Sequence, residues 1–270
     1  ELATIYASTV SLLPSHDADT NKIVARNHRI GVSVSGIADW IDATSLNHVT
    51  MVLRRGYEEY VEPTNIRLAQ EAGVPASVRL TVVKPSGSIS LLSGVSPGMH
   101  WPIFQYGIRR MRVNDISPIA ERLVKANVPF EKDAYSDNTL VFEFPMESGN
   151  GKTRSVEEVS MWEQASLVAT LQREWADNAV SNTISYSPSK EGRHIERLIS
   201  AFAPVIKSLS LLPNQGEAEN PYVQPPYEKT TKEEYVKRVR AIRPIDWESF
   251  GGSDGIDSRF CENDVCEIPQ

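Results

Sequence analysis

SVRLTVVKPSGSISLL, residues 77–92, runs from an expected strand through a tight turn into the start of a helix. Ser77–Val83 is rich in β-branched residues, which favour an extended strand. Pro85 follows, and the serines and glycine of Ser86–Ser90 are typical of a turn that opens a short helix. A strand that leads straight into a helix predicts an α/β arrangement for this part of the chain.

The same alternation of strand and helix continues along the chain. Helical spacing of apolar residues and short β-branched runs distinguish the two kinds of element. We expect helices at 64–72, 116–124, 155–175, 191–207 and 235–242, and strands at 107–113, 139–144, 182–187 and 209–212. Ser155 with Glu158, and Thr231 with Glu234, have the spacing of capping boxes that begin two of these helices. The expected fold class is therefore α/β, with a parallel or mixed sheet.

The composition is that of a globular protein. The chain has 270 residues, of which 40% are hydrophobic and 23% are charged, so it can bury a sizeable core. A net charge of −7 argues against general binding to nucleic acids or membranes, and no run approaches the roughly 20 apolar residues of a membrane span. The absence of a secretory signal and the low cysteine content favour a cytoplasmic location. The first residues, ELATIYAS, lack a methionine, which suggests a piece of a longer polypeptide.

The character of the sequence changes after residue 213. Residues 1–213 carry the pattern of strands and helices. Residues 214–250 are rich in proline and polar side chains and include one short helix, whereas 251–270 begin with the composition of a flexible linker. We expect these ranges to form an α/β part, an irregular segment and a flexible tail.

The turn Ser86–Ser90 is the sharpest internal candidate for a binding site. Gly87 lets a ligand approach the backbone closely, and unpaired N–H groups together with serine hydroxyls suit a phosphate. Lys84 adds a positive charge nearby. The same residues also fit a plain strand-to-helix turn with a capping serine, which is the more common feature. The Gly-Lys-Ser/Thr ending of a P-loop is missing.

Both cysteines of the chain, Cys261 and Cys266, lie within its last ten residues. Three explanations compete: a zinc site, incidental free thiols, and a redox pair carried on a swinging arm. Zinc needs about four ligands, and the nearest histidine is His194. The roughly dozen residues between Ser249 and Cys261 give a flexible reach of about 20 Å, which favours the redox pair. Acidic neighbours disfavour the thiolate and argue against its easy formation.

Other polar residues give weaker signals. The five histidines are scattered without metal-binding spacing, so we expect no metal site. Arg109, Arg110 and Arg112 could face an anionic ligand. Alternation along a strand puts Arg110 and Arg112 on one face, where salt bridges or solvent are the commoner partners.

Five stretches, in order along the chain, resemble ribonucleotide reductase large subunits. RNHRIGVSVSGIADW (26–40), KPSGSISLLSGVSPGMHWP (84–102) followed by IRRMRV, and DNAVSNTISYSP (177–188) are similar to segments of that family. PPYEKTTKEEY (225–235) and the Cys-x4-Cys end resemble its monomeric, adenosylcobalamin-dependent (class II) ribonucleoside-triphosphate reductases. The resemblance covers nearly the whole chain, as the C-terminal part of such an enzyme.

The resemblance implies a fold, a reaction and a set of site residues. The fold would be the C-terminal part of a ten-stranded α/β barrel. The reaction would be the thiyl-radical reduction of ribonucleoside triphosphates, with adenosylcobalamin as cofactor and a deoxynucleotide effector bound outside this chain. Cys261 and Cys266 would pass electrons from thioredoxin, or a similar dithiol, to an active-site disulfide. The substrate phosphate would be held by Ser86, Gly87, Ser88, Ile89 and Ser90.

The chain departs from that family in what it lacks. The radical cysteine, the active-site cysteine pair and the catalytic glutamate have no match here, so the chain alone should not turn over nucleotide. Alternatives stay open: a diphosphate-reducing ribonucleotide reductase of another class, or a non-catalytic nucleotide-binding module. The module has no use for a dithiol on a flexible arm. A small thiol oxidoreductase would carry Cys-x-x-Cys, which is absent.

Overall fold

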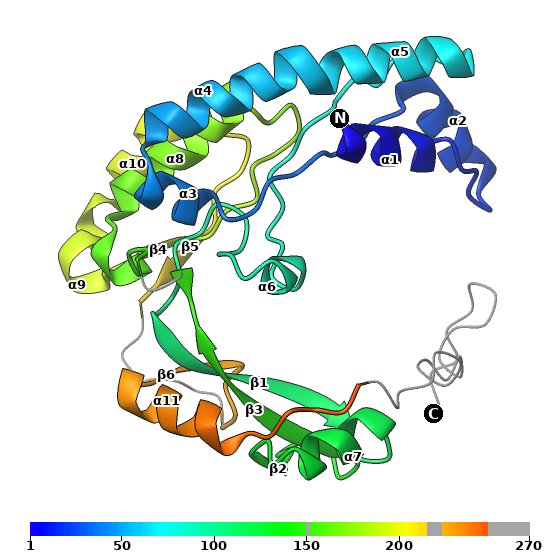
Figure 1. Cartoon of the computed structure of the whole chain (residues 1–270). Helices are drawn as coiled ribbons and strands as arrows, with labels where there is room; N and C mark the ends of the chain where they lie inside the picture. The colour runs from blue at the N-terminus through cyan, green and yellow to red at the C-terminus, as the bar shows by residue number, and fades with distance from the viewer. Residues whose placement is uncertain (150–151, 215–222, 248–270) are drawn as a thin grey trace. The chain divides into compact units, whose positions relative to one another are not determined.

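The computed structural model describes residues 1–149, 152–214 and 223–247, and the chain divides into two compact units (Figure 1). One unit comprises Glu1–Tyr106 and Glu147–Asn220, and the other comprises Gly107–Met146 and Pro221–Gln270. This division differs from the expected boundary after residue 213. The physical reason is strand pairing, because β1 (Tyr106–Asn114) pairs with β6 (Tyr227–Lys229) from beyond that boundary. The expected tail, 251–270, lies outside the described residues.

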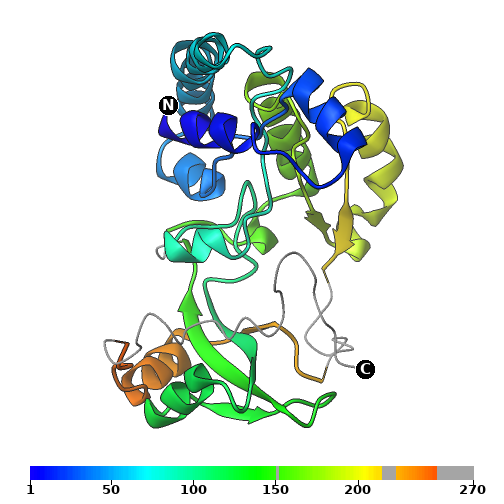
Figure 2. The ribbon, with the colours of Figure 1, turned by 90° about the vertical axis from the view of Figure 1, so that its right-hand side faces the viewer.

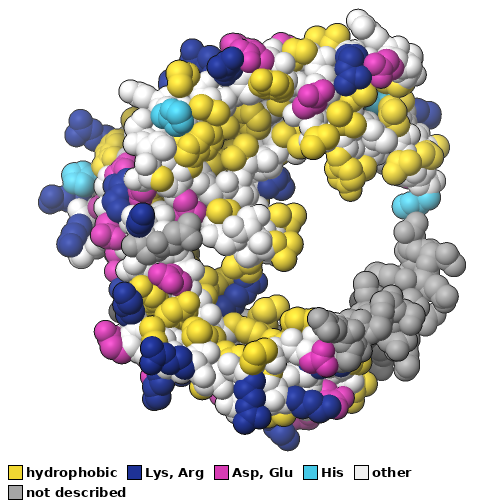
Figure 3. Space-filling model, viewed as in Figure 1, with side chains coloured by type: hydrophobic (Ala, Val, Ile, Leu, Met, Phe, Trp, Pro, Cys, Tyr) yellow, Lys and Arg dark blue, Asp and Glu magenta, His cyan; other side chains and the backbone are white. Residues whose placement is uncertain are grey.

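The first unit is mainly helical. Helices α4 (Leu46–Gly56) and α5 (Glu62–Ala72) are joined by the π-helical segment Tyr57–Val61 into one continuous rod (Figure 1). Hydrophobic and charged side chains are interspersed along this rod (Figure 3). Further helices of the unit are α1 (Leu2–Val10), α2 (Ala18–Asn27), α3 (Ile37–Ala43), α6 (Ile89–Leu92), α8 (Met161–Glu174), α9 (Pro188–Glu191) and α10 (Ile195–Phe202). No helix within the described ranges has the length and apolar character needed to span a membrane.

Four extended segments of this unit pair in parallel, in the order in which they occur in the chain. Val32 bridges to Thr81, and Val83 bridges to Val180. The last pair is more regular: β4 (Ile184–Tyr186) and β5 (Leu211–Pro213) form a two-stranded parallel sheet (Figure 2). Parallel neighbours connected through helices confirm the expected α/β class.

The strand expected at Ser77–Val83 forms only isolated bridges. Side chains of the turn after α8 also bond to the backbone of this segment. Trp175 Nε1–H donates to the Val82 carbonyl at 3.1 Å. Asn178 Nδ2–H donates to the Thr81 carbonyl and to a carbonyl of the neighbouring segment, each at 2.9 Å. These side-chain bonds add to backbone hydrogen bonds that the segment makes on both sides, such as Val82 N–H to the Val32 carbonyl at 3.0 Å and Asn178 N–H to the Thr81 carbonyl at 2.9 Å.

Helix α8 supplies much of the apolar core of the first unit. Ser155 and Glu158 form the expected capping box, but this box caps only a single 3-10 turn. The backbone then becomes extended at Val159, and Ser160 caps α8 itself by accepting the Glu163 N–H at 3.2 Å. The helix therefore begins later than expected. Its buried apolar residues are Met161, Ala165, Leu167, Val168, Ala169 and Leu171.

The second unit contains a four-stranded sheet with strand order β2-β3-β1-β6. β1 pairs antiparallel with β6, and β2 pairs antiparallel with β3. The remaining elements are β2 (Phe130–Lys132), β3 (Thr139–Glu147), α7 (Pro118–Lys125) and α11 (Lys232–Ala241). Its buried apolar cluster consists of Ala120, Leu123, Ala126, Val128 and Phe142.

Arginines of β1 form ion pairs within this unit. Arg110 Nη2 lies 2.8 Å from Glu143 and 2.6 Å from Glu228. Arg112 Nε lies 2.9 Å from Asp133. The expected salt-bridge role of these two arginines is therefore confirmed.

Candidate functional site

The loop Lys84–Ser90 continues from an extended segment and runs into the short helix α6 (Figure 1). Ser86 has a φ of 50°, a left-handed conformation that residues other than glycine rarely adopt. Gly87, Ser88 and Ile89 are exposed, and their three N–H groups make no hydrogen bond with a described residue. The loop therefore presents backbone donors to the outside, which suits an anionic ligand.

Two serines of an earlier extended segment hold this loop. Ser33 Oγ accepts the Lys84 N–H at 3.0 Å. The hydroxyls of Ser35 and Ser86 are hydrogen-bonded to each other. Because side chains alternate along an extended chain, the two serines of this segment lie on the same face. Val34, between them, packs against the apolar core and so orients that face towards the loop.

Gly98 contacts the loop through its backbone. Its N–H donates to Ser86 Oγ at 3.3 Å, and its carbonyl accepts the Ile37 N–H at 3.1 Å. Gly98 has a φ of 56°, and a Cβ at this position would overlap the Lys84 carbonyl. Glycine alone combines this left-handed backbone with so close an approach.

Asp39 of α3 joins the region after the loop to a more distant segment. Its Oδ2 accepts the Ser96 N–H at 2.6 Å, and its Oδ1 accepts the Thr153 hydroxyl at 2.7 Å. A carboxylate that bonds two segments in this way fixes their relative position.

Asp42, one helical turn further along, makes a second such connection. Arg154 Nη2 lies 2.8 Å from its carboxylate, and the Trp101 indole N–H donates to it at 3.2 Å. Burial opposes the ionisation of Asp42, but the hydrogen bonds and charge of Arg154 outweigh burial and lower its pKa. The ionised carboxylate thus ties α3 to Arg154 and Trp101.

His100 ties the segment after the loop to the start of β4. Its Nε2 accepts the Thr183 N–H at 3.0 Å, and its Nδ1 lies 3.0 Å from the Pro97 carbonyl. A peptide N–H only donates and a carbonyl only accepts, so this arrangement assigns a neutral ring with its proton on Nδ1. Burial lowers the pKa of His100 below its usual 6.5, opposed in part by the bond to Pro97.

His100 is expected to make the protein less stable in mild acid. Its pKa in the folded state lies below 6.5, so the unfolded chain takes up more protons as the pH falls. The contribution of neutral His100 to the free energy of unfolding is therefore complete above about pH 6.5. It is lost as the pH falls towards the lowered folded-state pKa. Urea unfolding between about pH 5 and 7.5 measures this dependence, which should be weaker in His100→Gln. Equal slopes in both proteins would assign the acid sensitivity to other groups.

The structure brings the expected residues Ser86–Ser90 together with side chains that sequence patterns alone did not indicate. These are Ser33 and Ser35, joined by the backbone of Gly98, while Asp39 holds the following segment through the Ser96 N–H. The alternation VSVS was a local signal for a serine face, but it did not identify the partner of that face. Cys261 and Cys266 lie outside the described residues. Among the residues that the structure describes, no cluster of three or more side chains could hold a metal ion.

Comparison with protein-family models gives no match. Among curated proteins, the chain is 36% identical over 268 residues to a probable adenosylcobalamin-dependent ribonucleoside-triphosphate reductase of Dictyostelium discoideum, covering 98% of this chain and 35% of that protein. It is 39% identical over 272 residues to the adenosylcobalamin-dependent ribonucleoside-triphosphate reductase of Euglena gracilis, with coverage of 98% and 36%. The corresponding enzyme of Levilactobacillus brevis is 32% identical, with coverage of 92% and 38%.

Solved structures give the same relationship. A B12-dependent (class II) ribonucleotide reductase matches with a TM-score of 0.80 and 30% identity, over 90% of this chain and 38% of that chain. The α subunit of a class Id ribonucleotide reductase from Actinobacillus ureae, at a TM-score of 0.52 and 14% identity, shares the fold alone, over 78% of this chain and 44% of that chain. The chain spans 35–38% of the length of the three curated relatives. Over nearly its whole length, this chain is therefore homologous to a part of the adenosylcobalamin-dependent, class II ribonucleotide reductases.

Proposed function

We propose that this chain is the C-terminal part of an adenosylcobalamin-dependent enzyme that reduces ribonucleoside triphosphates to 2′-deoxyribonucleoside triphosphates. One observation carries the proposal: the loop Lys84–Ser90, with its unpaired N–H groups, is held by Ser33, Ser35 and Gly98 in a chain related to such reductases. In this proposal the parallel segments of the first unit are later strands of a ten-stranded barrel.

The loop residues have different proposed roles. The N–H groups of Gly87, Ser88 and Ile89, with the Ser86 hydroxyl, donate to the phosphate oxygens of the substrate. Ser90 is only 2% exposed, and it shapes the loop through its N–H, which donates to the Ser86 carbonyl at 3.0 Å. The exposed Lys84, which forms no ion pair with a described residue, adds positive charge beside the phosphates.

The proposed electron route passes through Cys261 and Cys266. Each turnover replaces the ribose 2′-hydroxyl by hydrogen, releases water and oxidises an active-site dithiol to a disulfide. A tail thiolate attacks that disulfide, and the second tail thiol completes the exchange, so that the tail becomes a disulfide. Thioredoxin or a similar dithiol then reduces the tail by the same chemistry. Two electrons and two protons move at each exchange, so the sequence of steps is balanced.

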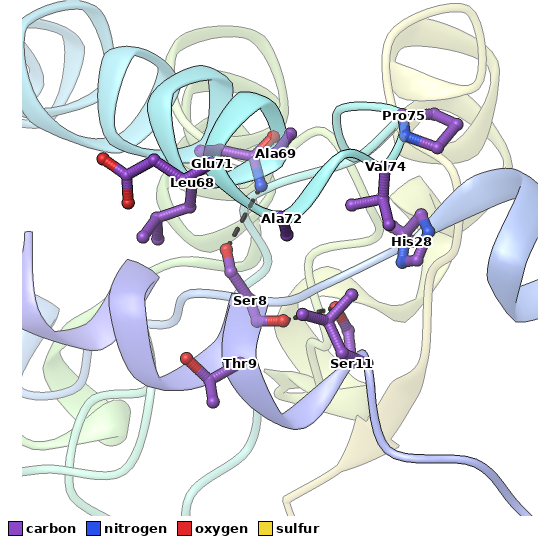
Figure 4. Close-up of a pocket in the computed structure, with 12 residues that line it drawn as sticks. Ser8, Thr9, Ser11, His28, Leu68, Ala69, Glu71, Ala72, Val74 and Pro75 are labelled. Carbon is purple, nitrogen blue, oxygen red and sulfur yellow. Dashed lines mark hydrogen bonds between the residues drawn. The ribbon is translucent and has the colours of Figure 1, made fainter.

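The cavity between α1 and α5 is too small to enclose adenosylcobalamin. A cavity of about 260 Å³ lies between α1 and α5, where Ser8, His28 and Val74 are among its lining residues (Figure 4). This volume is below the roughly 300–1,000 Å³ of pockets for drug-sized ligands, and a corrin cofactor is larger than such ligands. This cavity is therefore not a site for the cofactor.

Activity of the full-length protein tests the proposal. With adenosylcobalamin and dithiothreitol it is expected to convert CTP to dCTP, and omission of the cobalamin should abolish product formation. Reduction of CDP but not of CTP would favour the diphosphate-reducing alternative. Tight binding of CTP without reduction, in the presence of cobalamin and reductant, would favour a non-catalytic nucleotide-binding module.

A further inference from the structure

We infer that Ser35 is a positioning residue for the proposed phosphate site. Its hydroxyl donates a hydrogen bond to Ser86 Oγ. The Ser86 hydroxyl can then donate its own hydrogen bond to a phosphate oxygen of the substrate. This inference deepens the proposed function and rests on it. Its basis is the set of hydrogen bonds around the Ser86 hydroxyl.

The Ser86 hydroxyl has two neighbours in the structure. The Gly98 N–H donates to Ser86 Oγ at 3.3 Å, and Ser35 Oγ is hydrogen-bonded to the same atom. A serine hydroxyl offers two lone pairs and one proton. The Gly98 N–H can only donate, so it occupies one lone pair of Ser86. One lone pair and one proton remain for Ser35 and a ligand.

A bound phosphate decides the direction of the bond between the two serines. Ionised phosphate oxygens accept hydrogen bonds and do not donate them. The Ser86 hydroxyl must therefore use its single O–H to donate to the phosphate. Ser35 must then be the donor to Ser86. With both lone pairs occupied, the Ser86 hydroxyl can act towards a ligand only as a donor. This relay, in which Ser35 donates to Ser86 and Ser86 donates to the phosphate, favours anionic ligands. It also strengthens the hydrogen bond from Ser86 to the phosphate, because it polarises the Ser86 O–H.

The position of Ser35 is set by packing rather than by the ligand. Ser35 and Ser86 are 51 positions apart in the sequence, and both are half-buried. Val34 packs against the apolar core, which holds the adjacent Ser35 on the side of the loop. Asp39 bonds the Ser96 N–H at 2.6 Å and so helps keep the segment that contains Gly98 in place. The relay is therefore assembled in the structure before any substrate binds.

Equilibrium binding of CTP and of cytidine to the full-length reductase tests this role. Ser35→Ala removes the neutral bond that orients and polarises the Ser86 hydroxyl, so it is expected to weaken CTP binding by roughly threefold to tenfold and to leave cytidine binding unchanged. The KM for CTP should rise, while kcat stays within about twofold of wild type. Ser35→Thr keeps the hydroxyl and should restore CTP binding. Ser136→Ala is a matched control, because it removes an exposed hydroxyl pair with Thr139, at 3.1 Å, outside the site.

Several outcomes would overturn the inference. One is unchanged CTP affinity in Ser35→Ala; another is equal weakening of CTP and cytidine, which indicates a general distortion of the site. A fall in kcat with an unchanged KM would also contradict it. If wild type neither binds nor reduces CTP, the proposed function itself is wrong, and the inference falls with it. Thermal unfolding checks that each variant is folded; should Ser35→Ala unfold, Ser35→Cys gives the same comparison, because a thiol is a weak donor.

Discussion

Under the proposed electron route, replacing both Cys261 and Cys266 by serine is expected to stop thioredoxin-driven turnover of the full-length protein after the first cycle. Serine cannot form a disulfide, so the proposed path from thioredoxin to an active-site disulfide would be broken. The steady-state rate should fall by on the order of a hundredfold or more, because thiolate exchange is the only chemistry that links the two ends of this path. Formation of dCTP, measured during the first turnover and in the steady state, checks the result.

The choice of reductant separates a shuttle from a structural effect. Dithiothreitol is small enough to reach the active-site disulfide directly, so the double variant should keep its first turnover and its dithiothreitol-driven activity. Ser253→Ala, in the same tail, serves as the control and should turn over normally with thioredoxin. Unchanged turnover of the double variant with thioredoxin would mean that the tail thiols are incidental. Loss of activity with both reductants would point to damage elsewhere.

Gly98→Ala is expected to be the most damaging single replacement near the loop. Alanine is strained at a φ of 56°, and its Cβ would overlap the Lys84 carbonyl, so the backbone must shift. That shift weakens the bond from the Gly98 N–H to Ser86 Oγ. We expect a loss of roughly 2–4 kcal/mol in the free energy of unfolding and at least about tenfold weaker CTP binding. Chemical denaturation and equilibrium binding measure the two effects.

Two nearby glycines give graded controls for stability. Gly94 has a φ of 65°, but a Cβ there meets nothing within 4 Å, so Gly94→Ala should lose about 1 kcal/mol from backbone strain alone. Gly87 has neither the positive φ nor a close neighbour, and Gly87→Ala should stay within about 1 kcal/mol of wild type. If Gly98→Ala were as stable as Gly94→Ala, the close approach to Lys84 would not govern the fold here.

Local sequence patterns predicted whether a segment is a helix or a strand well where the pattern depends on residues close together in the chain. Short β-branched runs indicated β1 and β3, and helical patterns indicated α5 and α7. Capping also follows local rules, since Thr231 Oγ1 accepts the Glu234 N–H at 3.2 Å at the start of α11. The predicted start of α8 was wrong. Ser155 and Ser160 can both cap a helix, and only packing selects between them. The class II resemblance likewise came from local motifs, and the comparisons agree with it.

The sequence by itself predicted several of the helices and strands, indicated Ser86–Ser90 as a candidate phosphate loop, and contains the two tail cysteines. Only the tertiary structure decided which side chains meet at the loop. Ser35 and Ser86, which meet at the loop, are 51 positions apart, and Asp39 and Thr153, which are bonded outside the loop, are 114 positions apart. Contacts across such distances depend on how the extended segments align. A shift of one residue would turn Val34 towards the loop and both neighbouring serines away from it, because side chains alternate from one face to the other.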